Sequence, residues 1–167
     1  MALSIKPYIE NKERIHLIGI GGVSMSALGE LLLSLGVPVS GSDRLKTDVT
    51  ARLESLGAKI TYEHKAENVE GTSLIVRTAA VHDDNPEIVR AHALDIPVME
   101  RAEAWGHLMR DYDNVVCLAG THGKTTSTSM MTLMTMEAGL DPTVMVGSNL
   151  PAIGGTLRIG GKGCFVA

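Results

Sequence analysis

Short apolar runs alternate with helical patterns along most of the chain. Residues 15–20 (IHLIGI) form an apolar run that ends in glycines, which predicts a buried strand. In residues 24–35 the apolar positions recur at helical spacing, and Ser24 is suited to cap that helix. The same reasoning predicts further strands at 37–41, 58–63, 73–77 and 96–99, and further helices at 47–56, from Asn85 onward and at 100–110.

A polar stretch at residues 110–114 interrupts this pattern. We place a domain boundary there, which gives a first domain at 1–111 and a second at 112–167. The second domain is predicted to contain a buried strand at 115–120, a helix at 125–138, a strand at 143–146, a long glycine-rich segment at 147–163 and the start of a strand at Cys164.

Strands that alternate with helices predict an α/β fold in which helices cover both faces of a parallel sheet. The first domain is interpreted as a Rossmann-like sheet domain, and the second as the incomplete start of a P-loop ATPase α/β domain. Sheets of this kind bind ligands at the carboxyl ends of their strands, where both glycine-containing turns of this sequence fall.

Composition narrows the class of protein. The 167 residues are 44% hydrophobic and carry a net charge of −4, which argues against a general nucleic-acid binder. Only 3% are aromatic, so the core is expected to be aliphatic. Cys117 and Cys164 each lie in an apolar run and are predicted to be buried, reduced thiols. The N-terminus does not resemble a signal peptide and no apolar run is long enough for a membrane span, so a cytoplasmic protein is expected.

The first glycine turn is GIGGVSM at residues 19–25. Glycines there let the backbone approach a pyrophosphate, and the following helix directs its N-terminal N–H groups at the phosphates. Asp43 follows Gly21 by 22 residues, near the position at which such folds place an acid on a ribose hydroxyl. The third glycine of the usual pattern is Ser24 here. The pattern does not separate a nicotinamide dinucleotide from another nucleotide diphosphate, and a purely structural turn is the remaining alternative.

The second glycine turn is AGTHGKTT at residues 119–126. Leu118 stands where the strict phosphate-loop pattern has glycine. The chemistry is nevertheless present, because consecutive backbone N–H groups can surround phosphate oxygens. Lys124 is predicted to contact the β- and γ-phosphates, and Thr125 to hold Mg²⁺ through its hydroxyl. His122 is interpreted as a contributor of its backbone N–H, with a catalytic role of its side chain as the alternative.

With both turns considered, the sequence resembles the Mur ligases of peptidoglycan synthesis. The resemblance rests on five motifs that span nearly the whole chain: HLIGIGGVSMSAL (16–28), SGSD (40–43), DNPEI (84–88), IPVMERAE (96–103) and LAGTHGKTTSTSM (118–130). The motifs GIGGVSM and DNPEI favour the members that add L-alanine to UDP-N-acetylmuramate. For those members the resemblance implies an ATP-dependent carbon–nitrogen ligase, in which ATP phosphorylates the lactyl carboxylate and the amine of L-alanine attacks the acyl phosphate.

The resemblance also implies roles for individual residues. It assigns Lys124 and Thr125 to catalysis, with Thr125 as the metal ligand. It assigns ATP binding to Gly120, Thr121, His122, Gly123, Lys124, Thr125 and Thr126. It assigns UDP-sugar binding to Gly19, Gly21, Gly22, Val23, Ser24, Met25, Ser42, Asp43, His64, Thr78, Ala79 and Ala80.

The sequence departs from the family pattern at Ser24 and at Arg77, whose guanidinium could either assist a diphosphate or be solvated. It also lacks the acids expected after the strand that begins at Cys164, because Glu137 and Asp141 are the only acids after Lys124. We therefore expect an incomplete piece of a longer enzyme, able to bind the UDP-sugar but inactive alone. Residues 112–167 are expected to expose apolar surface. We therefore predict that this segment is either loosely ordered or buried in a homodimer contact. The alternatives are an NAD-dependent oxidoreductase, which leaves Gly123-Lys124-Thr125 unexplained, and a nucleotide-binding module without catalysis.

Overall fold

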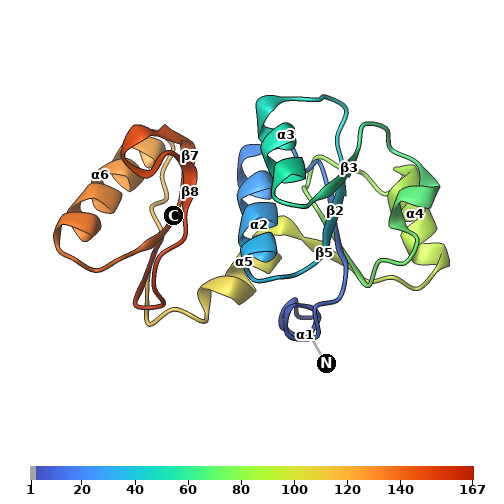
Figure 1. The fold of residues 1–167 in the computed structure, drawn as a ribbon, viewed down its shortest axis with the longest axis horizontal. Coiled ribbons are helices and arrows are strands. Elements are labelled where there is room, and N and C mark those ends of the chain that lie inside the picture. The colour runs from blue at the N-terminus through green and yellow to red at the C-terminus, as the bar shows by residue number, and fades with distance from the viewer. Residues whose placement is uncertain (1–2) are drawn as a thin grey trace. The chain divides into compact units, whose positions relative to one another are not determined.

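A computed structural model describes residues 3–167 of the chain. The chain forms two compact units, Met1–His107 and Leu108–Ala167 (Figure 1). The division falls slightly before the boundary placed at 111/112, inside the last helix of the first unit. Each unit is described separately below.

The first unit is built mainly of strands that alternate with helices. Its elements are α1 (Lys6–Glu10), β1 (Ile15–Ile18), α2 (Val23–Ser34), β2 (Val39–Ser42), α3 (Asp48–Ser55), β3 (Lys59–Thr61), η1 (Ala66–Val69), β4 (Leu74–Arg77), α4 (Pro86–Ala93), β5 (Val98–Glu100) and α5 (Arg101–Met109). Each strand and helix predicted from the hydrophobic pattern is present, with ends that differ by a few residues. The short helix α1 was not predicted.

The five strands of the first unit form one parallel sheet in the order β3-β2-β1-β4-β5. β1 is central and completely buried, and its Ile15 pairs with Val39 of β2 on one side and Leu74 of β4 on the other. Helices α2, α3 and α5 lie on one face of the sheet and α4 on the other (Figure 1). The strand order reverses between β1 and β4. In an open parallel sheet this switch point opens a crevice beyond the strand ends, and ligands bind in it.

Two helices of the first unit begin at well-defined side-chain caps. The hydroxyl of Thr47 accepts a hydrogen bond from the backbone N–H of Thr50, and the Thr50 hydroxyl accepts one from Thr47, which fixes the start of α3. The Asn85 side chain accepts a hydrogen bond from the Glu87 N–H, and Pro86 occupies the first position of α4. The cap at Asn85 therefore fixes Glu87 in the first turn of α4.

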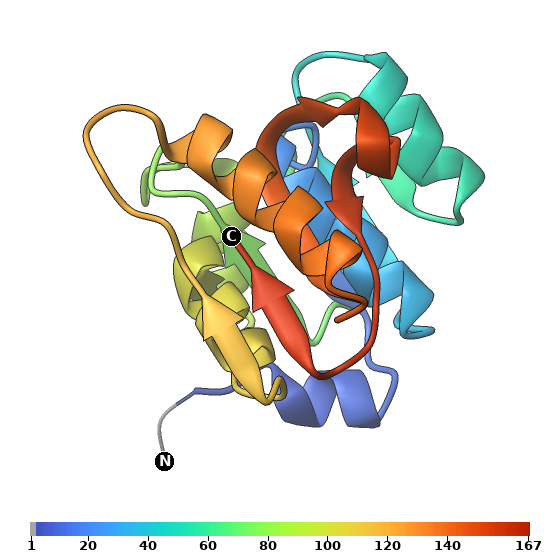
Figure 2. The same cartoon turned by 90° about the vertical axis from the view of Figure 1, so that its left-hand side faces the viewer.

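The second unit contains β6 (Asn114–Val116), α6 (Lys124–Glu137), β7 (Thr143–Leu150), η2 (Pro151–Ile153), β8 (Gly155–Arg158) and β9 (Cys164–Val166). The sheet order is β6-β9-β7-β8, with β7 and β8 antiparallel and the other pairs parallel. Figure 2 shows β6 and β9 side by side, with α6 alongside the sheet. Val144, Val146, Cys164 and Val166 form the core of this unit.

Two predictions for the second unit need correction. The buried strand predicted at 115–120 is the shorter β6, which is partly exposed because it lies at the sheet edge and pairs only with β9. Cys117 lies beyond the end of β6 and is exposed, so the prediction that it is buried is wrong, whereas Cys164 is buried as predicted. The glycine-rich segment at 147–163, to which the sequence assigned no element, completes β7 and forms β8.

Helix α6 buries hydroxyl groups and exposes apolar side chains. Thr128, Thr132 and Thr135 are buried, and each hydroxyl donates to the carbonyl oxygen four residues earlier in the helix. Met130, Leu133 and Met134 are exposed instead. Within residues 3–167, none of the helices is long and apolar enough to cross a membrane.

Candidate functional site

The first glycine turn follows β1 directly and is held by the end of β2. Gly19 has a φ of +79°, which a residue with a side chain rarely adopts, and its N–H donates to the carbonyl oxygen of Ser42 at 2.8 Å. The N–H of Gly21 donates to Oδ2 of Asp43, also at 2.8 Å. A Cβ atom on Gly21 would lie 2.8 Å from the same oxygen, so glycine is required there. Asp43 therefore braces the turn.

The turn leads into an uncapped helix N-terminus. Gly22 occupies the N-cap position of α2, and no side chain accepts a hydrogen bond from the first turn of the helix. Uncapped N–H groups at a helix start attract anions, because the helix dipole adds to their partial positive charge. The start of α2, rather than the turn before it, thus has the properties of a phosphate-binding site.

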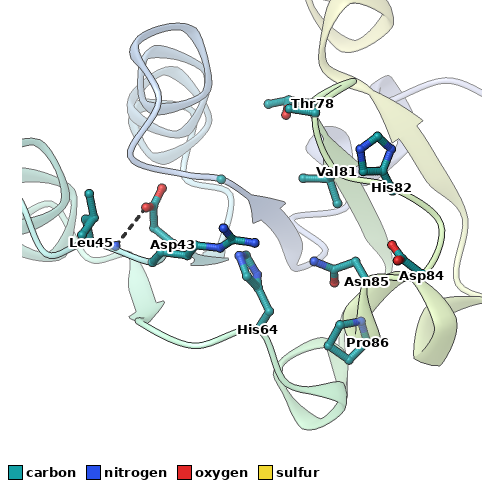
Figure 3. Close-up of a pocket in the computed structure, with 12 residues that line it drawn as sticks. Asp43, Leu45, His64, Thr78, Val81, His82, Asp84, Asn85 and Pro86 are labelled. Atoms are coloured by element: carbon teal, nitrogen blue, oxygen red, sulfur yellow. Dashed lines mark hydrogen bonds between the residues drawn. The ribbon is translucent and has the colours of Figure 1, made fainter.

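A cavity of about 640 Å³ opens beside this turn, at the carboxyl ends of the central strands (Figure 3). Five of the residues predicted to bind the UDP-sugar line it: Gly19, Asp43, His64, Thr78 and Ala80. In Figure 3, Asp43, Leu45 and His64 stand on one side, and Thr78, Val81, His82 and Asn85 on the other. The cavity therefore lies beside the crevice between β1 and β4.

Seven residues lining the cavity were not singled out from the sequence: Arg44, Leu45, Val81, His82, Asp84, Asn85 and Pro86. The guanidinium of Arg44 is exposed and forms no ion pair within the described part of the chain. Two sequence signals could have identified four of these residues. Arg44 directly follows the SGSD motif, and Asp84, Asn85 and Pro86 begin the DNPEI motif.

Other predicted residues of this site do not line the cavity. Met25 is completely buried in the core, so only its backbone could face a ligand. The Ser24 hydroxyl accepts a hydrogen bond from the indole N–H of Trp105 at 3.1 Å, which connects the glycine turn to α5. Gly21, Gly22 and Ala79 also lie outside the cavity lining, on the two loops that border it, as does Val23, the first residue of α2.

Ser42 belongs to a buried polar cluster around Glu87, which the sequence did not reveal. The Glu87 side chain is 0% exposed. Oε1 accepts hydrogen bonds from His16 Nε2 at 3.1 Å and from Asn68 Nδ2 at 2.8 Å. Oε2 accepts them from Ser42 Oγ and from His64 Nδ1, both at 2.7 Å. A single carboxylate thus connects β1, β2, η1, α4 and the loop that carries His64.

Glu87 is ionised in this cluster. Burial on its own raises the pKa of the carboxyl group, but the hydrogen bonds from His16, Asn68, Ser42 and His64 outweigh it. They lower the pKa from its ordinary value of 4.5 to about 2.

The guanidinium of Arg77 is occupied by protein groups and is not available to a ligand. Its guanidinium forms ion pairs with Asp83 and Glu100 and donates to the carbonyl oxygen of Val81. These bonds hold the loop that follows β4 against β5. Neither alternative considered from the sequence, a diphosphate contact or a solvated side chain, describes this arrangement.

The second glycine turn, in the other unit, connects β6 to α6. Gly123 caps α6 with a φ of +78°, and residues 119–127 are exposed. Lys124 Nζ donates to the carbonyl oxygens of Gly120 and Thr121 inside the turn. A Cβ atom on Gly147 of β7 would lie 3.3 Å from the Thr125 hydroxyl, so the glycine keeps this hydroxyl uncrowded.

This turn suits phosphate better than it suits a metal on its own. Its N–H groups are open to solvent and Lys124 supplies a positive charge, as a triphosphate requires. For Mg²⁺ the turn offers only the Thr125 hydroxyl, because the described residues contain no group of three or more His, Cys, Asp or Glu side chains that could hold a metal.

Comparisons with known proteins agree on one family. The sequence profile of the Mur ligase family, catalytic domain, matches residues 14–113, more than half of the chain. UDP-N-acetylmuramate–L-alanine ligase of Acetivibrio thermocellus is 49% identical over 93% of this chain and 33% of its own length. The enzyme of the same name from Clostridium novyi is 46% identical over 94% of this chain and 34% of its own length.

A solved structure shows the same fold. The crystal structure of UDP-N-acetylmuramate–alanine ligase from Thermotoga maritima matches with a TM-score of 0.85 and 36% identity, over 92% of this chain and 36% of that one. The chain thus spans about a third of the length of its relatives. The matching profile, the sequence identity and the shared parallel-sheet fold lead to one conclusion: this chain belongs to the Mur ligase family.

Proposed function

We propose that this chain is the nucleotide-binding part of an ATP-dependent ligase that joins L-alanine to UDP-N-acetylmuramate in peptidoglycan synthesis. The observation that supports this most directly is the coexistence of two phosphate-type turns, each between a strand and a helix, in a chain whose relatives carry that name. The proposal includes a role in cell-wall biogenesis, and hence in cell shape and division. It also includes a cytoplasmic location, where ATP is available.

The first unit is proposed to bind the UDP-sugar. The uncapped start of α2 and the turn at 19–24 would hold the diphosphate, and the cavity beside them would take the rest of the nucleotide. Asp43 and His64 would lie on the uridine side, and Thr78 and Ala80 on the opposite wall. Ser42, which is buried and donates to Glu87, would act from behind the cavity lining, and Ala79 would only connect Thr78 to Ala80. Val23, Ser24 and Met25 would contribute backbone N–H groups, whereas the Gly22 N–H already donates to the carbonyl oxygen of Gly19.

The second unit is proposed to bind ATP through residues 120–126. Its backbone N–H groups would surround the β- and γ-phosphates, while Lys124 would leave the carbonyl oxygens of Gly120 and Thr121 and move to the phosphates. Thr125 would be a ligand of Mg²⁺, which stabilises the charge that develops on the phosphoryl group during transfer. His122 would supply its N–H.

By itself, this chain is proposed to bind nucleotide but not to complete the ligation. Phosphoryl transfer needs an acid that positions the metal, and the described residues supply no acidic cluster near Thr125. The two acids after Lys124 are unsuited to the task. Glu137 is the last residue of α6, and Asp141 forms an ion pair with Arg158.

Calorimetric titration with UDP-N-acetylmuramate tests the proposal, with NAD⁺ as the parallel ligand. We expect saturable binding of the UDP-sugar and none of NAD⁺. Binding of NAD⁺ without the UDP-sugar would instead favour an oxidoreductase. A ligase assay with ATP and L-alanine is expected to give no product from this chain, and product formation would contradict the view that it needs further residues.

We also propose that the exposed side chains Met130, Leu133 and Met134 of α6 form a contact with a second copy of the chain. Apolar side chains gathered on one helix favour association. This part of the proposal is tested at the end of the Discussion.

A further inference from the structure

The hydrogen atoms in the Glu87 cluster can be assigned from its geometry. An ionised carboxylate only accepts hydrogen bonds, so each nitrogen that faces it must carry a hydrogen atom. The distances to Glu87 are 3.1 Å from His16 Nε2 and 2.7 Å from His64 Nδ1. His16 therefore has its hydrogen on Nε2, and its Nδ1 lies 2.9 Å from Ser40 Oγ, which can donate to it. His64 has its hydrogen on Nδ1.

This assignment leaves one nitrogen of His64 for a ligand. Nε2 has no hydrogen-bond partner among residues 3–167, while the His64 side chain is 17% exposed and lines the cavity (Figure 3). The ring cannot rotate without loss of a 2.7 Å bond to a buried carboxylate. A free histidine samples both tautomers and several rotamers, whereas this one is held in a single arrangement.

We propose that Glu87 is a positioning residue, which acts through His64 so that His64 Nε2 faces the cavity as a hydrogen-bonding atom for a uridine nucleotide. The inference rests on the proposed function for the choice of ligand, but not for the Glu87–His64 contact. A neutral Nε2 accepts from a hydroxyl or imide N–H, and a protonated one donates to an oxygen. Glu87 itself is buried and does not touch the nucleotide.

A purely structural role for the cluster makes a different prediction. If Glu87 only joins five segments of the first unit, His64 matters solely through Nδ1, and its Nε2 is irrelevant to binding. The two roles can be separated because asparagine places an amide N–H near the position of Nδ1 but has no atom at Nε2. The variant H64N keeps a donor for Glu87 and removes Nε2 together with the ring carbon Cε1.

The first experiment is spectroscopic. Long-range ¹H–¹⁵N spectra of the uniformly labelled chain, without ligand, are expected to show His64 protonated at Nδ1 and His16 at Nε2. In E87Q the amide NH₂ replaces one acceptor oxygen, so at least one of these imidazoles should move its hydrogen to the other nitrogen. An unprotonated Nδ1 in the wild-type His64, or unchanged histidine signals in E87Q, would overturn the proposal.

The second experiment measures UDP binding by calorimetry in the wild type, H64N and H64Q. Loss of one hydrogen bond to a ligand is expected to weaken the affinity of H64N roughly tenfold. H64Q, whose longer amide reaches the position of Nε2, should recover part of this loss. Unchanged UDP affinity in a folded H64N would show that His64 is only structural. Thermal unfolding of each variant checks that it is folded.

The two proposals fail in different ways. If the wild-type chain does not bind UDP but shows His64 protonated at Nδ1, the ligand assignment is wrong and Glu87 still positions His64. If the wild type binds UDP but its His64 carries hydrogen only on Nε2, the nucleotide site stands and the positioning role of Glu87 is refuted.

Discussion

Glu87 makes the free energy of unfolding of the first unit depend on pH in the acidic range. The folded-state pKa of about 2 lies below the ordinary value of 4.5, so the ionised carboxylate stabilises the fold at pH values above 4.5. That contribution is lost as the pH falls from about 4.5 towards about 2. The shift corresponds to about 3 kcal/mol. Urea unfolding of the wild type at several pH values should show this loss in the free energy of unfolding.

The variant E87Q has no carboxylate at this position and should lack that pH dependence. It should also be less stable than the wild type at neutral pH, by about 2–4 kcal/mol, because an amide cannot accept from all four donors. E10Q replaces an exposed glutamate of α1 and serves as the control. If the free energy of unfolding of E87Q falls with pH as it does in E10Q and the wild type, Glu87 is not the cause of the acid sensitivity.

Gly21 is a second residue whose replacement should change the stability, because the first glycine turn has no room for a Cβ atom there. A Cβ atom there would lie 2.8 Å from Asp43 Oδ2 and 3.2 Å from Thr50 Cγ2, so G21A should push Asp43 away and open the turn. We expect a loss of about 1–3 kcal/mol in the free energy of unfolding, together with weaker UDP binding. G22A is the matched control for stability, because its Cβ meets nothing closer than 3.4 Å. Equal stability of the two variants would contradict this view of the turn.

The elements of the first unit were predictable because local pattern and tertiary context agree there. The buried runs and helical repeats of residues 15–109 became the expected strands and helices. In the second unit, strand pairing and position in the sheet decided the structure against the local sequence pattern. β8 has one buried apolar side chain, Leu157, and is a strand because it pairs with β7. β6 is apolar in sequence yet partly exposed, because it lies at an edge.

The candidate site was predictable only in part, for a similar reason. Gly19, Asp43, His64, Thr78 and Ala80 follow strands, and parallel strands bring their carboxyl ends to one edge, so sequence order sufficed to group them. The role of Glu87 depends on four partners that lie 71, 45, 23 and 19 residues away. A periodicity argument does not detect contacts of that kind.

Helix α5 contains a glycine that its packing does not require. Gly106 has open space at the position of a Cβ atom and lies inside the helix. G106A should raise the free energy of unfolding by about 0.5–1 kcal/mol, because alanine loses less backbone entropy when the helix forms. Gly29 of α2 provides the contrast, since its Cβ would lie 3.2 Å from Leu17 Cδ1. A gain in G29A as large as that in G106A would show that the contact has no cost.

At the scale of the whole molecule, the chain combines a first unit whose central strand is buried on both faces with a second unit whose helix exposes apolar groups. α6 is attached to its sheet partly through threonines, whose hydroxyl groups are satisfied within the helix. Met130 and Met134 are 60% and 64% exposed. One turn of helix separates them, so they lie on the same face and form a continuous apolar surface with Leu133.

This surface is expected to drive self-association of the chain. In sedimentation velocity, the wild type should sediment faster as its concentration rises, and M134K should not. Lysine near the end of α6 removes apolar area and agrees with the helix dipole, so the helix itself should remain intact. V89K makes the same change at Val89, which is 54% exposed on α4, and should behave as the wild type does. A wild-type chain that remains monomeric at all concentrations, with residues 115–138 strongly protected from amide exchange, would show that α6 needs no second copy to cover it.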